Sequence, residues 1–145
     1  RVIRQPRNQG PSAARNAGLE AAATPLVAFL DSDDTWRPDH CASVGALLDR
    51  FPEVAVAAGN VPLIMYLGDA GLLPPPGEAV DALPWLMLTN FVPQSAAIVR
   101  RDAVRATGGY RSDWRHAEDY ELWLRLAVAH RFARHGEVTV DRGSH

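Results

Sequence analysis

The chain has 145 residues, of which 47% are apolar and 22% charged, so it holds one globular core and is too apolar for a disordered chain. Its net charge of −2 gives no bias toward nucleic acid, and all 15 basic residues are arginine, which excludes lysine Schiff-base chemistry and a lysine-dependent phosphate site. The single Cys41 excludes an internal disulfide and a zinc cluster built on cysteine pairs.

A single domain is expected over residues 1–145, with no internal domain boundary. No apolar run approaches the ~18 residues that cross a membrane, and no signal peptide is visible, so we expect a cytoplasmic setting, with a peripheral position at the inner face of the membrane as an option. The chain begins with Arg1 in the middle of what looks like a working element. We therefore expect a fragment of a longer domain.

The first half of the chain predicts two helices that alternate with two strands. A helix is expected over residues 12–23, because Pro11 and Ser12 make a suitable start and alanine dominates the interior. The apolar run 25–30 predicts a short strand that is buried on both faces of a sheet. Residues 38–50 then predict a helix and 53–60 a strand. This alternation is typical of an α/β domain.

The second half predicts a loop (67–78), a strand (94–101), a short helix (103–107) and a long amphipathic helix (117–130). Asp102 is expected to cap the short helix, and Gly108 and Gly109 to end it. Tyr120 and Trp123 recur on one face of the long helix, which predicts that this face packs on the core.

Three carboxylates, Asp31, Asp33 and Asp34, follow the first predicted strand within four positions. The carboxyl ends of strands are where open α/β sheets bind ligands. Taken alone, the cluster fits a solvated turn that caps the next helix, or a site where a divalent ion bridges a diphosphate. An EF-hand is excluded, because Trp36 and Ala42 occupy the positions where that loop needs glycine and glutamate.

The segment FLDSDDT also resembles, locally, the Asp-x-Asp-x-Thr strand end of haloacid-dehalogenase-like phosphotransferases. That resemblance implies Asp31 as the phosphorylated nucleophile, Asp33 as the general acid–base and magnesium as their electrostatic partner. The chain lacks the lysine that this family usually uses, and its other acidic pair, Glu118 and Asp119, opens a long helix. This alternative is therefore a distant one.

Two further segments accompany the aspartates, RNQGPSAARNAGLEAA at 7–22 and GGYRSDWRHAEDYELWLRLA at 108–127. Together with FLDSDDTWRPD they resemble the inverting family 2 glycosyltransferases of the GT-A fold. That family shows Asn-x-Gly, Ala-Arg-Asn, an Asp-x-Asp strand end, a Gly-Gly-aromatic turn, and Glu-Asp opening a helix that reads LWLRLA. All five occur here in that order, and the series is far more specific than a lone Asp-x-Asp.

The resemblance covers nearly the whole chain and implies an α/β, GT-A-like (Rossmann-like) fold, with a mostly parallel sheet flanked by helices. Family members begin with a strand–helix–strand unit whose loops hold the nucleotide base. The resemblance thus implies an N-terminally incomplete domain that lacks these nucleotide-binding strands.

The donor half of the site is implied by the first motifs. Asp31 and Asp33 match the motif that binds the metal and the nucleotide sugar, and Asp34 is a possible substitute ligand or substrate contact. Arg15 and the adjacent Asn16 match Ala-Arg-Asn, which faces the nucleotide side of the cleft, so both are expected to bind substrate.

The acceptor half is implied by the acidic pair. Asp119 matches the catalytic base, and Glu118 beside it would bind the acceptor or support the base. Inverting transfer needs a carboxylate that takes the acceptor proton and, on the other face, a metal that stabilises the departing diphosphate. From the residues alone, the preference of carboxylates for a helix N-terminus would also explain the pair.

The function implied by the resemblance is transfer of a sugar from a nucleotide-diphosphate sugar to a hydroxyl acceptor, assisted by Mg²⁺ or Mn²⁺. The acceptor would be a glycan, a lipid-linked saccharide or a small molecule, as in cell-envelope polysaccharide biosynthesis. The alternative from another class is a non-catalytic remnant of such a domain that binds a nucleotide or glycan without turnover.

Overall fold

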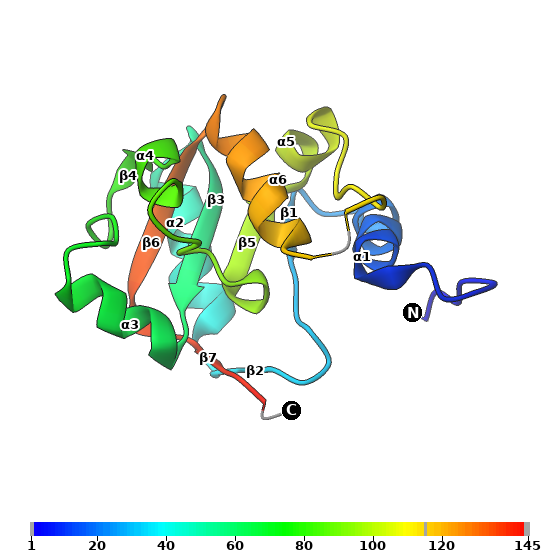
Figure 1. Cartoon of the computed structure of the whole chain (residues 1–145), viewed down its shortest axis with the longest axis horizontal. Helices are drawn as coiled ribbons and strands as arrows, with labels where there is room; N and C mark the ends of the chain where they lie inside the picture. The colour runs from blue at the N-terminus through cyan, green and yellow to red at the C-terminus, as the bar shows by residue number, and fades with distance from the viewer. Residues whose placement is uncertain (1, 115, 144–145) are drawn as a thin grey trace.

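The computed structural model describes residues 2–114 and 116–143. In chain order, its elements are α1 (Gly10–Ala21), β1 (Leu26–Ala28), β2 (Thr35–Trp36), α2 (His40–Arg50), β3 (Val54–Asn60), α3 (Pro62–Asp69), β4 (Ala79–Asp81), α4 (Leu83–Leu86), the 3₁₀ turn η1 (Gln94–Ala96), β5 (Ala97–Arg100), α5 (Arg101–Ala106), α6 (Glu118–Ala127), β6 (Arg131–Val138) and β7 (Val140–Asp141). Figure 1 shows the strands at the centre with helices around them.

A five-stranded sheet in the order β1-β5-β3-β6-β4 forms the centre of the described fold. β3 pairs parallel with β6, whereas the β1–β5, β5–β3 and β6–β4 pairs are antiparallel. The expected α/β, GT-A-like class is confirmed, and β1, β3 and β6 share one direction. The pairing is more mixed than a mostly parallel sheet, because antiparallel β5 lies between β1 and β3 and antiparallel β4 occupies one edge.

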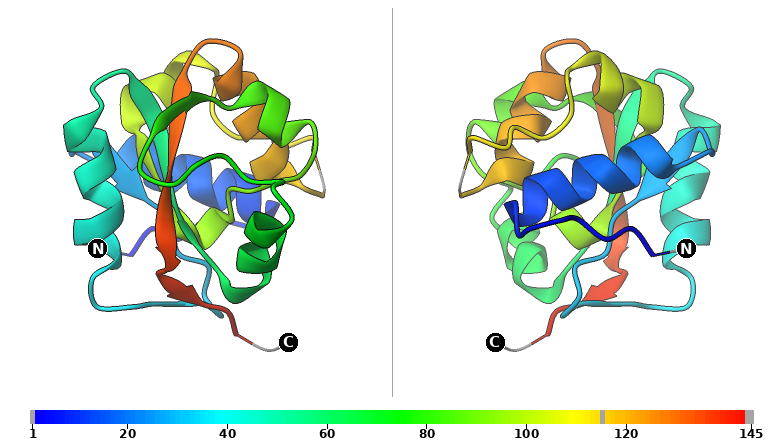
Figure 2. Two further views of the ribbon diagram at one scale, coloured as in Figure 1. Left: turned by 90° about the vertical axis from the view of Figure 1, so that its left-hand side faces the viewer. Right: turned by 90° about the vertical axis from the view of Figure 1, so that its right-hand side faces the viewer.

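Helices cover both faces of the sheet, as the two side views show (Figure 2). On β5, Ala97 and Val99 face one apolar cluster, which includes Trp123 of α6, whereas Ile98 faces the other, which includes Val44 of α2. Every residue of β3 is buried. A strand covered on both faces explains why its sequence is apolar from Val54 to Ala58 rather than alternating between apolar and polar residues.

The predicted helices and strands of the first half are confirmed within a few residues, and both Gly108 and Gly109 adopt the positive φ angles that end α5. The prediction that Asp102 caps this helix is wrong. α5 begins at Arg101, so Asp102 lies in the first turn, where its carboxylate pairs with the Arg101 guanidinium at 3.5 Å. The predicted loop begins later than residue 67, because α3 extends to Asp69.

None of the described helices is both long enough and apolar enough to cross a membrane.

Candidate active site

A cleft of about 400 Å³ opens at the edge of the sheet where β1, β3 and β6 end. Side chains from the segments after these strands line it, together with the segment that leads into β5 and the start of α6. The lining comprises Arg15, Asp31, Asp34, Val61, Leu63, Ile64, Leu67, Thr89, Asn90, Pro93, Gln94, Ser95, Glu118, Asp119 and Arg142. The carboxyl ends of same-direction strands are the usual position for a ligand site in such sheets.

Arg15 joins the two acidic regions of the sequence inside this cleft. Its Nη2 donates to Asp31 Oδ1 at 2.7 Å and its Nη1 donates to Glu118 Oε1 at 2.6 Å. The side chains of Arg15 and Glu118 are 14% and 15% exposed, and that of Asp31 is 38% exposed. Although burial opposes the charge on Arg15, its hydrogen bonds with the two carboxylates raise its pKa.

The aspartate cluster is fixed by backbone contacts. The Asp31 backbone N–H donates to Ser95 Oγ at 3.0 Å, and the Asp34 N–H donates to the Asp31 carbonyl at 3.1 Å. Asp34 Oδ1 also accepts a hydrogen bond from the Gly143 N–H at 3.3 Å. Asp31 and Asp34 line the cleft, whereas Asp33 is not among its lining residues. A Cβ at Gly143 would lie 2.0 Å from the Asp33 carbonyl oxygen, so this close approach requires glycine.

The acidic pair opens α6, where Ala117 at the N-cap has a left-handed φ of 53°. Non-glycine residues in this conformation are strained and concentrate at functional sites. Asp119 Oδ1 accepts a hydrogen bond from the Tyr120 N–H at 2.7 Å, and Asp119 Oδ2 accepts one from Asn90 Nδ2 at 3.4 Å. The left-handed turn thus precedes a carboxylate that is held at both oxygens.

The two neighbouring carboxylates differ in acidity. Burial, together with the negative charge of Glu118, raises the pKa of Asp119. For Glu118, burial is outweighed by its own backbone hydrogen bond and by the Arg15 guanidinium, so its pKa is lowered. Adjacent acids whose pKa values move apart are suited to different roles, with the stronger base at Asp119.

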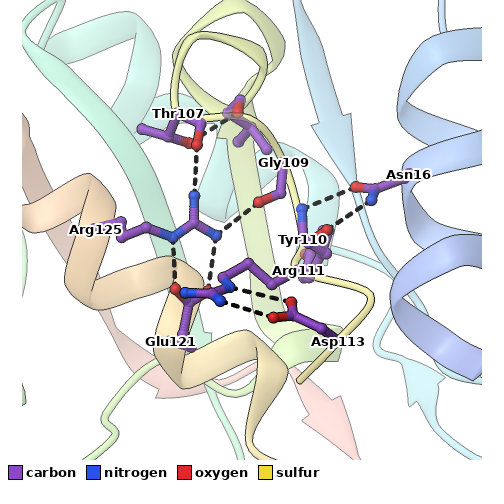
Figure 3. A network of polar contacts seen from close by, with 9 residues as sticks. Asn16, Thr107, Gly109, Tyr110, Arg111, Asp113, Glu121 and Arg125 are labelled. Carbon is purple, nitrogen blue, oxygen red and sulfur yellow. Dashed lines mark hydrogen bonds and ion pairs between the residues drawn. The ribbon is translucent and has the colours of Figure 1, made fainter. Parts of the chain in front are cut away.

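Asn16 supports the site from outside the cleft lining. Its Nδ2 donates to the Tyr110 carbonyl at 2.7 Å, and its Oδ1 accepts from the Tyr110 N–H at 2.8 Å, as Figure 3 shows. A Cβ at Gly109 would lie 2.6 Å from Asn16 Oδ1, which explains the glycine in this turn. The amide predicted to bind substrate is therefore occupied in joining α1 to the Gly-Gly-aromatic turn.

Arg125 of α6 holds the same turn from the other side (Figure 3). Its guanidinium donates to the carbonyls of Thr107 and Gly109, both at 2.6 Å, and forms a bidentate pair with Glu121 at 2.7 and 2.8 Å. Because Arg125 lies in the helix that carries Asp119, this network fixes α6 relative to the turn. These contacts give a structural reason why the Gly-Gly-aromatic turn and the LWLRLA helix occur together in the sequence.

The lining residues that were not predicted as site residues include Asn90, Ser95 and Arg142. Asn90 and Ser95 act through partners 29 and 64 positions away in the chain, Asp119 and Asp31. Arg142 is brought to the cleft by the pairing of β7 with β2, both of which are two-residue strands. A local sequence pattern does not predict contacts between residues this far apart in the chain.

The sequence profile of Glycosyl transferase family 2 matches residues 1–108. The chain belongs to glycosyltransferase family 2. It is also 33% identical, over 154 aligned positions, to a pre-mycofactocin glycosyltransferase of Mycobacterium tuberculosis. That alignment covers 99% of this chain and 32% of the relative, so the chain spans about a third of that protein's length. Family membership decides against the phosphotransferase alternative.

Solved structures share the fold of this glycosyltransferase. The mannosyltransferase PcManGT from Pyrobaculum calidifontis, in complex with GDP-Man and Mn²⁺, matches with a TM-score of 0.73 and 18% identity over 97% of this chain and 38% of that one. TarS 1–349 of S. aureus in complex with UDP matches with a TM-score of 0.67 and 17% identity over 92% of this chain and 40% of that one. Identities this low support the fold and not the ligands.

Proposed function

We propose that this family 2 glycosyltransferase transfers a sugar, with inversion, from a nucleotide-diphosphate sugar to a hydroxyl acceptor. The observation that carries the proposal is the double contact of Arg15, which places the Asp31 region and the start of α6 in one cleft. A single displacement needs groups for the leaving diphosphate and a base for the acceptor within reach of the same anomeric carbon.

The donor half would use Asp31, Asp33 and Asp34 with Mg²⁺ or Mn²⁺. The described residues contain no group of three or more His, Cys, Asp or Glu side chains arranged for a metal ion. The residues present still fit, because Mg²⁺ is commonly held by one or two carboxylates while substrate phosphates and water complete its shell. We assign Asp31 and Asp33 as metal ligands, with Asp34, which lines the cleft, as the substitute. When bound, the metal would stabilise charge on the leaving diphosphate.

PcManGT and TarS, whose fold this chain shares, were solved with GDP-Man and with UDP, and the donor proposed here belongs to the same chemical class. Besides Arg15, the cleft lining contains a second basic residue, Arg142. We assign both guanidiniums to the electrostatic environment of the diphosphate. An arginine suits this role because its planar N–H groups match phosphate oxygens.

The acceptor half would use Asp119 as the general base. The acceptor oxygen attacks the anomeric carbon as its proton passes to the Asp119 carboxylate, and the bond from that carbon to the diphosphate oxygen breaks. The raised pKa of Asp119 makes it a stronger base than an exposed aspartate. Glu118, whose carboxylate is bound to Arg15, would orient the arginine and support the base.

Calorimetry tests the donor half. UDP and GDP are titrated into the protein with and without Mn²⁺, using the wild type, Asp31→Asn, Asp33→Asn, and the exposed Asp49→Asn on α2 as the matched control. We expect Mn²⁺-dependent binding that weakens about tenfold or more in the first two variants, since one ligand and one charge are lost. Nucleotide binding that does not depend on Mn²⁺, or an affinity that is equal in all variants, would contradict the assignment of the metal ligands. Binding without transfer of any donor sugar would favour the non-catalytic remnant.

A further inference from the structure

A second groove, of about 570 Å³, lies between the N-terminal end of α1, with the Asn-x-Gly motif at 8–10, and residues 112, 114 and 116, and the proposed mechanism assigns it no role. Its chemistry comes from Asn8, Gln9, Ser12, Ser112, Trp114 and His116. We propose that this groove binds a neutral sugar residue of a glycan acceptor. The inference rests on the proposed function, because it names the acceptor class for the same reaction.

Trp114 provides an aromatic surface in the groove. Its side chain is 46% exposed, although indole is the largest apolar group available to a protein. The Arg111 guanidinium lies 5.8 Å from the indole centroid, and its Nη2 is held at 2.7 Å by Asp113 Oδ2. Arg111 and Asp113 are seen together in Figure 3. A positioned, exposed indole suits the apolar C–H face of a sugar ring, just as amphipathic aromatic rings serve other interfaces.

Ser12 provides an unsatisfied polar group in the same groove. Its side chain is 3% exposed, and its Oγ has no hydrogen-bond partner within the described part of the chain. Buried polar atoms are nearly always paired, and an unpaired one costs free energy, so such an atom calls for a partner. A hydroxyl both donates and accepts, which matches the hydroxyl groups of a sugar.

Polar side chains at the start of α1 line the groove. The helix backbone adds little there, because the Gly10 N–H donates to Asn8 Oδ1 at 2.9 Å and Pro11 has no N–H. The amide groups of Asn8 and Gln9, of which Gln9 Nε2 also donates to Gln5 Oε1 at 3.3 Å, and the hydroxyl of Ser112 form a polar surface without a carboxylate. This composition distinguishes the groove from the acidic cleft and favours a neutral ligand.

The groove adjoins the active site along two elements. Ser12 precedes Arg15 by three residues of α1, a rise of about 4.5 Å. His116 precedes Glu118 by two residues. A glycan seated against Trp114 would therefore lie beside the acceptor side of the cleft, where Asp119 opens onto it.

Binding by NMR tests the site without relying on turnover. The protein is titrated with maltose, cellobiose, lactose and mannobiose, and the indole Nε1–H signals are followed, with that of Trp114 identified from Trp114→Phe. We expect at least one disaccharide to shift the Trp114 signal in a saturable way. Trp114→Ala and Ser12→Ala should each weaken binding, the first by about tenfold, because an aromatic contact of this size is lost. Leu88→Ala, an exposed apolar truncation elsewhere, should bind like the wild type.

The proposed sugar site would be contradicted if none of the four disaccharides shifted the Trp114 signal. It would also be contradicted if Trp114→Ala and Leu88→Ala bound the disaccharide with equal affinity. Displacement of the disaccharide by inorganic phosphate at millimolar concentration would indicate an anion site instead. Failure of the proposed function is separable. UDP and GDP would then fail to bind with Mn²⁺ while the disaccharide still shifts Trp114, whereas failure of the groove leaves nucleotide binding intact.

Discussion

At the scale of single residues, Arg15 connects the two halves of the site. It contacts the largely buried Glu118 at 2.6 Å and the more exposed Asp31 at 2.7 Å. Removing it leaves both carboxylates without the guanidinium that joins them. Lysine would keep the charge but lacks the planar fork that reaches two partners at once.

We predict that Arg15→Ala lowers the free energy of unfolding by about 2 kcal/mol, since uncompensated, poorly solvated carboxylates remain. Urea unfolding measures the change. The matched control is Arg105→Ala, which breaks an exposed pair with Glu20 at 3.2 Å and should cost less than about 1 kcal/mol. Equal losses in the two variants would mean that the Arg15 contacts contribute no more than a surface ion pair.

Asp119 combines an expected cost in stability with its proposed role in catalysis, and the sign of that cost follows from its raised pKa. A carboxyl whose pKa is higher in the folded than in the unfolded state loses stability as the pH rises through the folded value. Asp119→Asn should therefore be more stable than the wild type at pH 7. The difference should vanish below about pH 3, where aspartate is protonated in both states. Urea unfolding at both pH values measures this, and a variant less stable at pH 7 would contradict it.

If Asp119 is the general base, as proposed, it also sets the fall of activity at low pH. Because the base must be ionised, kcat/KM should fall as the pH is lowered through the raised pKa of Asp119. A pH–rate profile measures this fall. A profile that stays flat down to the ordinary aspartate pKa would contradict the assignment.

At the scale of elements, the start of α6 stores strain at Ala117, whose φ is 53°. Left-handed backbone costs an L-residue roughly 1–2 kcal/mol, and glycine avoids that cost. We predict that Ala117→Gly raises the free energy of unfolding by about 1 kcal/mol, despite the added freedom of the unfolded chain. In the exposed interior of α2, Ala46→Gly should instead lower it by about 1 kcal/mol. A loss in both variants would show that no strain is stored at 117.

Elements with a strong pattern were predictable from the sequence. β3 is apolar from Val54 to Ala58, and α6 carries an apolar stripe at helical spacing, so both were recognised. β6 was missed although it lies inside the sheet, because its sequence includes two arginines and a histidine. Arg134 is buried there, and its Nε donates to the Pro74 carbonyl at 3.0 Å, a partner 60 positions away.

The candidate site was predictable only in part, for the same reason. The motifs indicated Arg15, Asp31 and Asp119, and the fold brings these three to one cleft. Asp33 and Asn16 were indicated with equal strength, yet neither lines that cleft. The path of the Asp31–Asp34 turn and the double hydrogen bond of Asn16 to Tyr110 decide this, and both depend on tertiary contacts.

At the scale of the whole molecule, the fold brings three segments that are distant in the sequence together at one edge of the sheet. Arg15 and Glu118 are 103 positions apart in the chain, yet their side chains lie 2.6 Å from each other. One acidic region follows β1, the other opens α6, and the arginine between them comes from α1. In the proposed mechanism, this arrangement separates a donor side from an acceptor side within a single cleft.

The most direct test of the account is Asp119→Asn in the full protein, measured for both sugar transfer and nucleotide binding. In the proposed mechanism Asp119 acts only on the acceptor proton. We therefore predict that transfer falls by at least about a hundredfold, as expected for loss of a general base, while the affinity for the nucleoside diphosphate with Mn²⁺ changes by less than about threefold. Transfer that persists in the variant, or an equal loss of transfer and nucleotide binding, would contradict the assignment of Asp119 as the base.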